Sequence, residues 1–181
     1  IGLENTDITT NERGAIVVND TCESSVSGVY AVGDVNGGPQ FTYISLDDFR
    51  IVFGALTGNG QYTLKDRKNI PYTTFLTPPL ARIGLTEEDS INKGYTVKTK
   101  EMLVATMPRA HVNDYLKGAF KIVVNADNDL ILGATLYSQG AEELINLIKM
   151  AMDNNIPYTY FKNQIFTHPT MAENLNDLCN F

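Results

Sequence analysis

Apolar side chains recur at the spacing of an α-helix in two stretches of this chain. Residues 141–154 carry the clearer pattern, and residues 43–56 carry a second one that ends at the Gly-Asn-Gly of positions 58–60. Such a stripe predicts a helix that buries one face. The stripe of the later helix is broad enough for core packing and also for a subunit contact, and it comprises Leu144, Ile145, Leu147, Ile148, Ala151 and Met152. The face of the earlier helix comprises Ile44, Phe49, Val52, Phe53 and Leu56.

Runs of β-branched and aromatic residues predict strands on both sides of the earlier helix. Residues 14–19 form one such run, and residues 29–32 form a continuous apolar run closed by Gly33 and Asp34, as is typical of a buried strand in a parallel sheet. Antiparallel strands followed by helices predict an α+β fold for the later part of the chain. Its strands are expected at residues 72–76, 81–85, 95–107, 118–125 and 130–138.

Two polar segments lie between these later strands. Residues 86–89, Thr-Glu-Glu-Asp, form a capping box that opens a short helix ending at Gly94. Residues 127–129, Asp-Asn-Asp, tolerate left-handed backbone and make the hairpin turn between the last two strands.

Composition places the chain among ordinary globular proteins. Of its 181 residues, 43% are apolar, which is enough for a core. The formal net charge is -7 and the 14 Lys and Arg residues form no cluster, so we expect no nucleic-acid partner. No apolar run approaches the about 18 residues of a membrane helix and no signal peptide opens the chain, so a cytoplasmic protein with no membrane partner is expected. Because the chain starts at Ile1, within a predicted strand and turn, we expect it to be part of a longer protein.

The two cysteines, Cys22 and Cys179, lie far apart in the sequence and form no C-x-x-C or other metal-binding spacing. We therefore expect two reduced structural thiols and no metal site.

Candidate acid–base chemistry lies near the end of the chain, where His168 precedes Pro169 and Thr170. Because proline favours the first turn of a helix, a helical turn is expected to begin at residues 169–171, which brings Glu173 back toward His168. A carboxylate on one ring nitrogen would leave the other nitrogen free to exchange a proton near neutral pH. Thr170 and Glu173 also match a capping box, which would occupy the same carboxylate. Capping boxes are common and His–Glu pairs are rare, so the residues alone favour the capping interpretation.

The segment around Asp34 is weak evidence by itself, since aspartate at a strand end is ordinary turn chemistry. Taken whole, however, residues 24–34 (Ser-Ser-Val-Ser-Gly-Val-Tyr-Ala-Val-Gly-Asp) resemble the second flavin-binding signature of the FAD-dependent pyridine nucleotide–disulfide oxidoreductases. That family includes glutathione reductase, dihydrolipoamide dehydrogenase and mercuric reductase. The resemblance implies that Asp34 holds the ribityl hydroxyls of FAD, that Gly33 permits a close approach, and that the backbone of Thr42 faces the flavin ring.

The later part of the chain is similar to the interface domain of the same family. Residues 78–86, Pro-Pro-Leu-Ala-Arg-Ile-Gly-Leu-Thr, match its opening motif, and His168, Pro169, Thr170 and Glu173 match its terminal motif. The resemblance implies a C-terminal piece of the FAD-binding domain and a linker in residues 1–69, and a dimerisation domain in residues 70–181. It also implies that His168 is an acid–base residue, oriented by Glu173, which acts on the flavin and dithiol of the partner subunit in a homodimer. A cis peptide before Pro169 is expected by the same resemblance.

The family's other motifs are absent from this sequence: the G-x-G-x-x-G of the FAD pyrophosphate, the redox cysteine pair and the nicotinamide-binding unit. The intact enzyme is expected to use FAD and NAD(P)H on a disulfide or small-molecule substrate. The 181-residue chain alone is expected to be inactive, to bind neither cofactor appreciably, and to serve at least as a dimerisation module. Residues 37–45 favour a mercuric-reductase-like branch that reduces a small oxidant.

Overall fold

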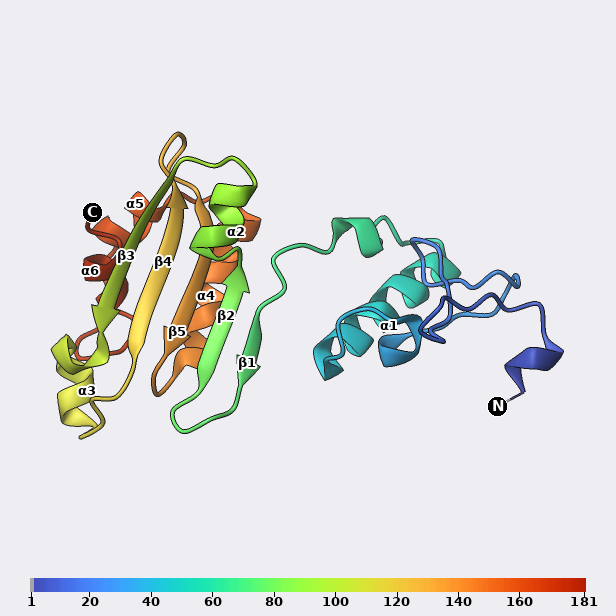
Figure 1. Cartoon of the computed structure of the whole chain (residues 1–181), viewed down its shortest axis with the longest axis horizontal. Helices are drawn as coiled ribbons and strands as arrows, with labels where there is room; N and C mark the ends of the chain where they lie inside the picture. The colour runs from blue at the N-terminus through green and yellow to red at the C-terminus, as the bar shows by residue number, and fades with distance from the viewer. Residues whose placement is uncertain (1) are drawn as a thin grey trace. The chain divides into compact units, whose positions relative to one another are not determined.

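A five-stranded antiparallel sheet organises the later part of the chain in the computed structural model, which describes residues 2–181 (Figure 1). Its strand order is β1-β2-β5-β4-β3. The strands span Tyr72–Thr74 (β1), Leu80–Gly84 (β2), Val97–Leu103 (β3), Ala119–Asn125 (β4) and Ile131–Tyr137 (β5). The chain divides into two compact units, one up to Lys68 and the other Asn69–Phe181, and each is described by itself.

Three helices cover one face of the sheet in the second unit: α4 (Ala141–Asp153), α5 (Tyr158–Asn163) and α6 (Asn174–Leu178) (Figure 1). The short helix α2 (Glu87–Asn92) lies over the opposite face (Figure 1). Alternate strand residues face the three helices, because successive side chains of a strand point to opposite sides. These inward residues include Ala81, Ile83, Phe120, Ile122, Ala134 and Leu136, which join the buried stripe of α4 in one core. The predicted α+β arrangement of an antiparallel sheet with helices packed on one face is confirmed, and the short α2 is an addition on the other face.

Local sequence signals account for most boundaries in this unit. The capping box opens α2 as predicted, with the Thr86 side chain accepting from the Asp89 N–H and the Asp89 side chain accepting from the Thr86 N–H. The hairpin turn between β4 and β5 places Asp129 at a φ of 62°, in the left-handed region that Asp tolerates. Gly133 is required by close packing, because a Cβ there would lie 2.1 Å from the carbonyl oxygen of Leu85.

The strand predicted at residues 95–107 is too long, because β3 ends at Leu103 and a 3₁₀ turn follows it. Helix α3 (Pro108–Val112) follows the 3₁₀ turn η4 (Val104–Thr106) and carries an exposed His111, whose ring nitrogen lies 2.8 Å from the Ala105 carbonyl oxygen. None of the helices that the structure describes is long and apolar enough to cross a membrane.

The first unit contains one long helix, α1 (Thr42–Thr57), and the 3₁₀ turns η1 (Leu3–Asn5), η2 (Gly33–Asn36) and η3 (Leu64–Asp66). The prediction of α1 is confirmed, with Gly58 ending it at a φ of 73°. The predicted strands at residues 14–19 and 29–32 are wrong, because only isolated antiparallel bridges form there. A strand exists only where neighbours supply hydrogen bonds. No neighbouring strand flanks Val29 and Val32 among residues 2–181, and both side chains are exposed.

The apolar face predicted for α1 is only partly buried in this unit. Ile44 and Ile51 are buried, and Asp48 lies between them on the same face. Phe49, Phe53 and Leu56 remain more than half exposed. The buried stripe of α1 is therefore narrower than the hydrophobic pattern indicated, and it includes a carboxylate.

We predict that the core of the second unit depends on Leu136, whose side chain is fully buried on β5. Leu136→Ala should lower the free energy of unfolding by about 2–5 kcal/mol, because it removes buried methyl groups and leaves a cavity. The matched control is Leu103→Ala at the end of β3, where the side chain is 59% exposed and the loss should stay below about 1 kcal/mol. Urea unfolding monitored by circular dichroism measures both changes, and equal losses would contradict the assignment of the core.

Candidate active site

His168 lies on the extended connection between α5 and α6, and its side chain is 68% exposed. The His168–Pro169 peptide bond is cis, as expected. The predicted start of a helix at residues 169–171 is wrong, because α6 begins at Asn174. Side-chain to backbone hydrogen bonds between Thr170 and Glu173 close a separate turn before the helix.

Glu173 joins that turn to the imidazole. Its Oε2 lies 2.7 Å from Nδ1 of His168, and its Oε1 accepts a hydrogen bond from the Thr170 N–H at 3.1 Å. The Glu173 N–H in turn donates to Oγ1 of Thr170 at 3.2 Å, which completes the geometry of a capping box. The His–Glu pair and the capping box were treated as competitors for one carboxylate, and this view is wrong, because each interaction uses a different carboxylate oxygen.

The electrostatics of the pair favour an ionised carboxylate. The hydrogen bond to His168 lowers the pKa of Glu173 below its ordinary value, and the Thr170 N–H adds to this against the opposing effect of desolvation. The Glu173 side chain is only 18% exposed. An ionised carboxylate accepts a hydrogen bond from Nδ1–H, and this leaves Nε2 of His168 as the ring nitrogen available for proton exchange.

The segment that carries His168 is anchored from both sides. Asn176, on α6, donates from Nδ2 to the carbonyl oxygens of Phe161 at 2.7 Å and Gln164 at 2.9 Å. Asn174, which is buried, donates to the carbonyl oxygen of Thr170 at 3.2 Å. At the far end of α6, Lys100 donates to the carbonyl oxygen of Asp177 at 2.8 Å. These contacts hold the connection in place while the imidazole remains exposed.

The three residues expected to contact FAD lie in the first unit, in the turn η2 and at the start of α1. Gly33 is buried with a φ of 72°, and a Cβ there would lie 2.9 Å from Oγ of Ser45. The left-handed backbone at this position favours glycine, and the turn packs closely against Ser45 of α1. Asp34 is exposed, and its carboxylate makes no hydrogen bond or ion pair with residues 2–181. Thr42 is the first residue of α1, where backbone N–H groups lack partners within the helix.

Asp48 and Arg67, which the sequence reasoning missed, hold the turn η2. Asp48 is completely buried and bonds to the backbone of Gly33, and Arg67 forms ion pairs with both Asp48 and Asp47. A signal was present in the sequence, because Asp48 stands at helical spacing between Ile44 and Ile51. A carboxylate on a buried helical face requires a partner.

Neither cysteine has the character of a redox residue. Both side chains are fully buried. Burial raises the pKa of the Cys22 thiol to about 11, with a smaller contribution from the charge of Asp48, and burial raises the pKa of the Cys179 thiol to about 12. Thiolates are the reactive form, and burial disfavours the thiolate of both cysteines near neutral pH. No group of three or more His, Cys, Asp or Glu side chains within residues 2–181 is placed to hold a metal ion.

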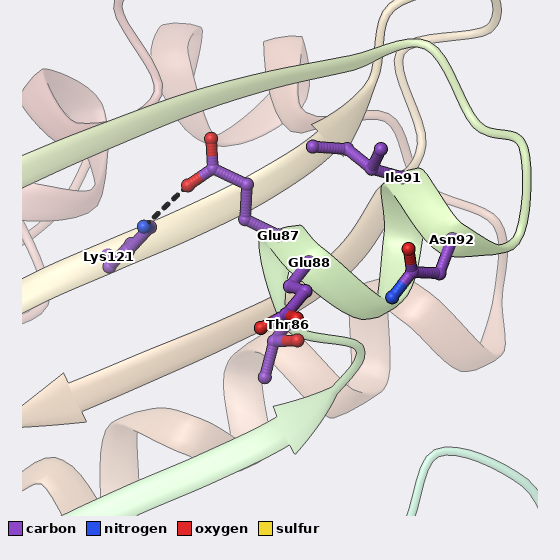
Figure 2. A pocket seen from close by; sticks show the side chains of 6 residues that line it. All are labelled: Thr86, Glu87, Glu88, Ile91, Asn92 and Lys121. Carbon is purple, nitrogen blue, oxygen red and sulfur yellow. Dashed lines mark hydrogen bonds and ion pairs between the residues drawn. The ribbon is translucent and has the colours of Figure 1, made fainter.

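A hollow of about 490 Å³ lies beside α2, on the face of the sheet opposite α4 (Figure 2). Figure 2 shows Glu87 of α2 pointing toward Lys121 of β4, and the two form an ion pair at 2.7 Å. The hydrogen bond to Lys121 lowers the pKa of Glu87, which keeps the pair charged. Glu87 and Lys121 therefore satisfy each other's charge, and the hollow contains no histidine among its lining residues.

Comparison with known proteins identifies the family. Residues 70–179 match the model of the pyridine nucleotide-disulphide oxidoreductase dimerisation domain, which is more than half of the chain. The chain belongs to this family. Residues 1–48 also match the model described as pyridine nucleotide-disulphide oxidoreductase. The resemblance seen in the sequence is thus confirmed, including the small piece of FAD-binding domain that precedes the dimerisation domain.

Similar family members act as oxidoreductases. The probable pyridine nucleotide-disulfide oxidoreductase RclA of Escherichia coli is 47% identical over 175 residues, which cover 97% of this chain and 40% of RclA. A mercuric reductase of Staphylococcus aureus is 33% identical, with 97% of this chain and 32% of that protein covered. A solved structure of RclA, described as an HOCl-induced flavoprotein disulfide reductase, matches with a TM-score of 0.96 and 46% identity, covering 99% of this chain and 41% of that one. The chain thus spans about two fifths of the length of RclA.

We predict that His168 sets the pKa of Glu173. His168→Ala should raise the pKa of Glu173 toward its ordinary value of 4.5, because it removes the largest stabilising contact of the carboxylate. A carboxylate with a lowered pKa stabilises the fold above the unfolded-state pKa, and this stabilisation is lost as the pH falls through the folded-state pKa. The variant should therefore lose less stability than the parent on acidification below pH 4.5.

Carboxyl ¹³C NMR titration of the 181-residue chain measures this pKa directly. The matched control is His111→Ala, which removes an exposed imidazole from α3 and should leave the titration of Glu173 unchanged. An unchanged midpoint in His168→Ala would show that the pair does not persist in solution.

Proposed function

We propose that this chain supplies the acid–base pair and the dimer contact of an NAD(P)H-dependent flavoprotein disulfide reductase. The observation that supports this most directly is the exposed imidazole of His168, held at 2.7 Å by the carboxylate of Glu173 within a dimerisation domain. An imidazole buried in the core of its own subunit would have opposed the proposal, because it could reach no second subunit. The His168 side chain is 68% exposed and is therefore accessible to a second subunit.

His168 moves the proton in the proposed reaction. Glu173 fixes the ring orientation through Nδ1, so Nε2 can take a proton from a thiol of the partner subunit's dithiol and return it to the leaving thiolate of the substrate. Each thiolate that attacks a disulfide releases another thiolate, so the proton taken at one stage is needed at the next. A disulfide is therefore the substrate class that this single acid–base group fits.

The FAD residues fit the cofactor in their chemistry. FAD would supply the two-electron carrier between NAD(P)H and the dithiol. The exposed carboxylate of Asp34 can accept hydrogen bonds from ribityl hydroxyls, and the backbone of Thr42 at the start of α1 can approach the ring system. These groups form one edge of a binding site. We propose that the 181-residue chain alone binds FAD weakly or not at all, because these groups form only one edge of a site. We also propose that it is inactive alone, because its two buried thiols offer no redox pair.

The proposed partner is a second copy of the same chain, joined through residues 70–181. Ile165, three residues before His168, is an apolar side chain that is 95% exposed, and Tyr160 beside it is 54% exposed. Both line a hollow of about 590 Å³ next to the connection that carries His168. Apolar exposure of this kind marks a surface that another protein covers. Contact here would place His168 at the subunit boundary.

The C-terminus offers no accessible thiol for the mercuric-reductase-like branch that residues 37–45 favour. Metal-binding thiols must be deprotonated and accessible. The single C-terminal Cys179 is fully buried, and burial raises its pKa to about 12.

We predict that His168→Gln slows only the thiol–disulfide half of the reaction. In the FAD-loaded, full-length flavoprotein that contains these residues, kcat/KM for a disulfide should fall by about 10²–10⁴, the usual contribution of a general acid–base group. Reduction of the flavin by NAD(P)H in stopped-flow measurements should keep its rate, because that step does not use the imidazole.

His111→Gln is the matched control, and it should leave both half-reactions unchanged. Glu173→Gln should lower kcat/KM less than His168→Gln and should shift its pH profile. Disulfide reduction within a few-fold of the parent in His168→Gln would exclude the catalytic role.

We also predict that the 181-residue chain is a dimer at micromolar concentration. Light scattering should give twice the mass of one chain, because the dimerisation domain is present. Ile165→Asp should shift the mass toward that of the monomer by placing a charge in the proposed contact. Ile91→Asp, at a 55% exposed position of α2 on the opposite face, is the control and should remain dimeric. A strict monomer in the unsubstituted chain would oppose the proposal.

A further inference from the structure

One carboxylate in the first unit has no access to solvent. Asp48 is 0% exposed on α1, although aspartate is almost never fully buried unless it is paired. Its Oδ2 accepts a hydrogen bond from the Gly33 N–H at 2.7 Å and another from Nδ2 of Asn36 at 2.9 Å. Its Oδ1 is paired with Nη2 of Arg67. Both hydrogen bonds to Oδ2, one from the backbone and one from a side chain, therefore come from residues of the turn η2.

The two donors to Oδ2 are the first and last residues of η2, Gly33–Asn36. A single oxygen atom thus closes the turn from both ends, and Asp34 lies between them with its carboxylate exposed. The turn is also held directly against α1, since a Cβ on Gly33 would lie 2.9 Å from Oγ of Ser45. The position and shape of η2 are consequently set by α1, through Asp48.

Arg67 completes the arrangement from a distant part of the sequence. Its Nε donates to Oδ2 of Asp47 at 2.7 Å while Nη2 binds Asp48, so one guanidinium joins two successive carboxylates of α1. The Arg67 side chain is only 10% exposed, and Tyr62 adds a hydrogen bond to Asp47 at 3.3 Å. Arginine suits this role, because its planar fork presents several donors in a fixed geometry and remains charged.

We propose that Asp48, held by Arg67, is a positioning residue that fixes the turn η2 so that Asp34 can bind the ribityl chain of FAD. The inference rests on the proposed function, because it takes Asp34 as the FAD contact. Asp48 itself has no exposed surface with which to touch the cofactor, so it acts through the backbone of Gly33 and the side chain of Asn36. Removing its charge would leave the guanidinium of Arg67 buried with one partner fewer.

The test is a double-mutant cycle in the full-length flavoprotein, with the Kd for FAD measured by fluorescence titration of the apoprotein. Asp34→Ala and Asp48→Asn should each raise the Kd at least tenfold. In the Asp34→Ala background, Asp48→Asn should have less than a threefold further effect, because the group that it positions is gone. A merely structural role would give effects that multiply.

Two further variants sharpen the test. Arg67→Met should also raise the Kd, because it removes the guanidinium that holds Asp48, and a parent-like Kd would overturn the part assigned to Arg67. Asp20→Asn is the control, because Asp20 pairs with Lys65 on the surface of the same unit, and its Kd should stay within twofold of the parent.

The outcomes separate the two proposals. An unchanged Kd in Asp34→Ala would refute the FAD contact itself. Weaker binding in Asp34→Ala with parent-like binding in Asp48→Asn, or with fully multiplicative effects, would overturn the positioning role alone. If Asp48→Asn does not fold, amide hydrogen exchange in the unsubstituted chain decides. The Gly33 N–H should be protected as strongly as the interior amides of α1, and exchange at the rate of an unprotected amide would overturn the inference.

Discussion

The carboxylate of Glu173 is the contact on which the candidate active site depends. One oxygen orients the imidazole of His168 and the other closes the backbone turn at Thr170, so the geometry of the histidine and the fold of the preceding chain are coupled in one side chain. The free-energy cost of removing this carboxylate from water is small, because Glu173 is partly exposed and has a charge-assisted partner on each oxygen. The result is an imidazole that is held at Nδ1 while its side chain remains 68% exposed.

The first unit also contains a carboxylate with a different partner on each oxygen, but this one is buried. The carboxylate of Asp48 binds the backbone N–H of Gly33 and the guanidinium of Arg67. The turn that it closes carries Asp34. The two sites differ in their surroundings. Glu173 lies near solvent and needs no counter-charge, whereas Asp48 is fully buried and is matched by the guanidinium of Arg67. In both units, therefore, an acidic side chain is hydrogen-bonded to the segment that carries a candidate site residue, His168 in one and Asp34 in the other.

Much of the fold could be predicted from local patterns. The helices α1 and α4, the capping box at Thr86 and the turn at Asp129 follow from periodicity and turn chemistry, which act over a few residues. The predicted strand at residues 29–32 is wrong because strand formation depends on neighbours, and an apolar run says nothing about whether they are present. The start of α6 was misplaced because side-chain hydrogen bonds of Thr170 compete with the helix.

By itself, the sequence determined the α+β class, and its match to the family motifs identified His168, Glu173 and Asp34 as candidate site residues. Only the tertiary structure decided how Glu173 divides its two oxygens, and that Gly33 packs against Ser45 of α1. It alone brought Arg67 to Asp48, 19 positions earlier in the chain. The physical reason is range: periodicity and capping arise among neighbours in sequence, whereas burial and the pairing of charges depend on which distant segments the fold brings together.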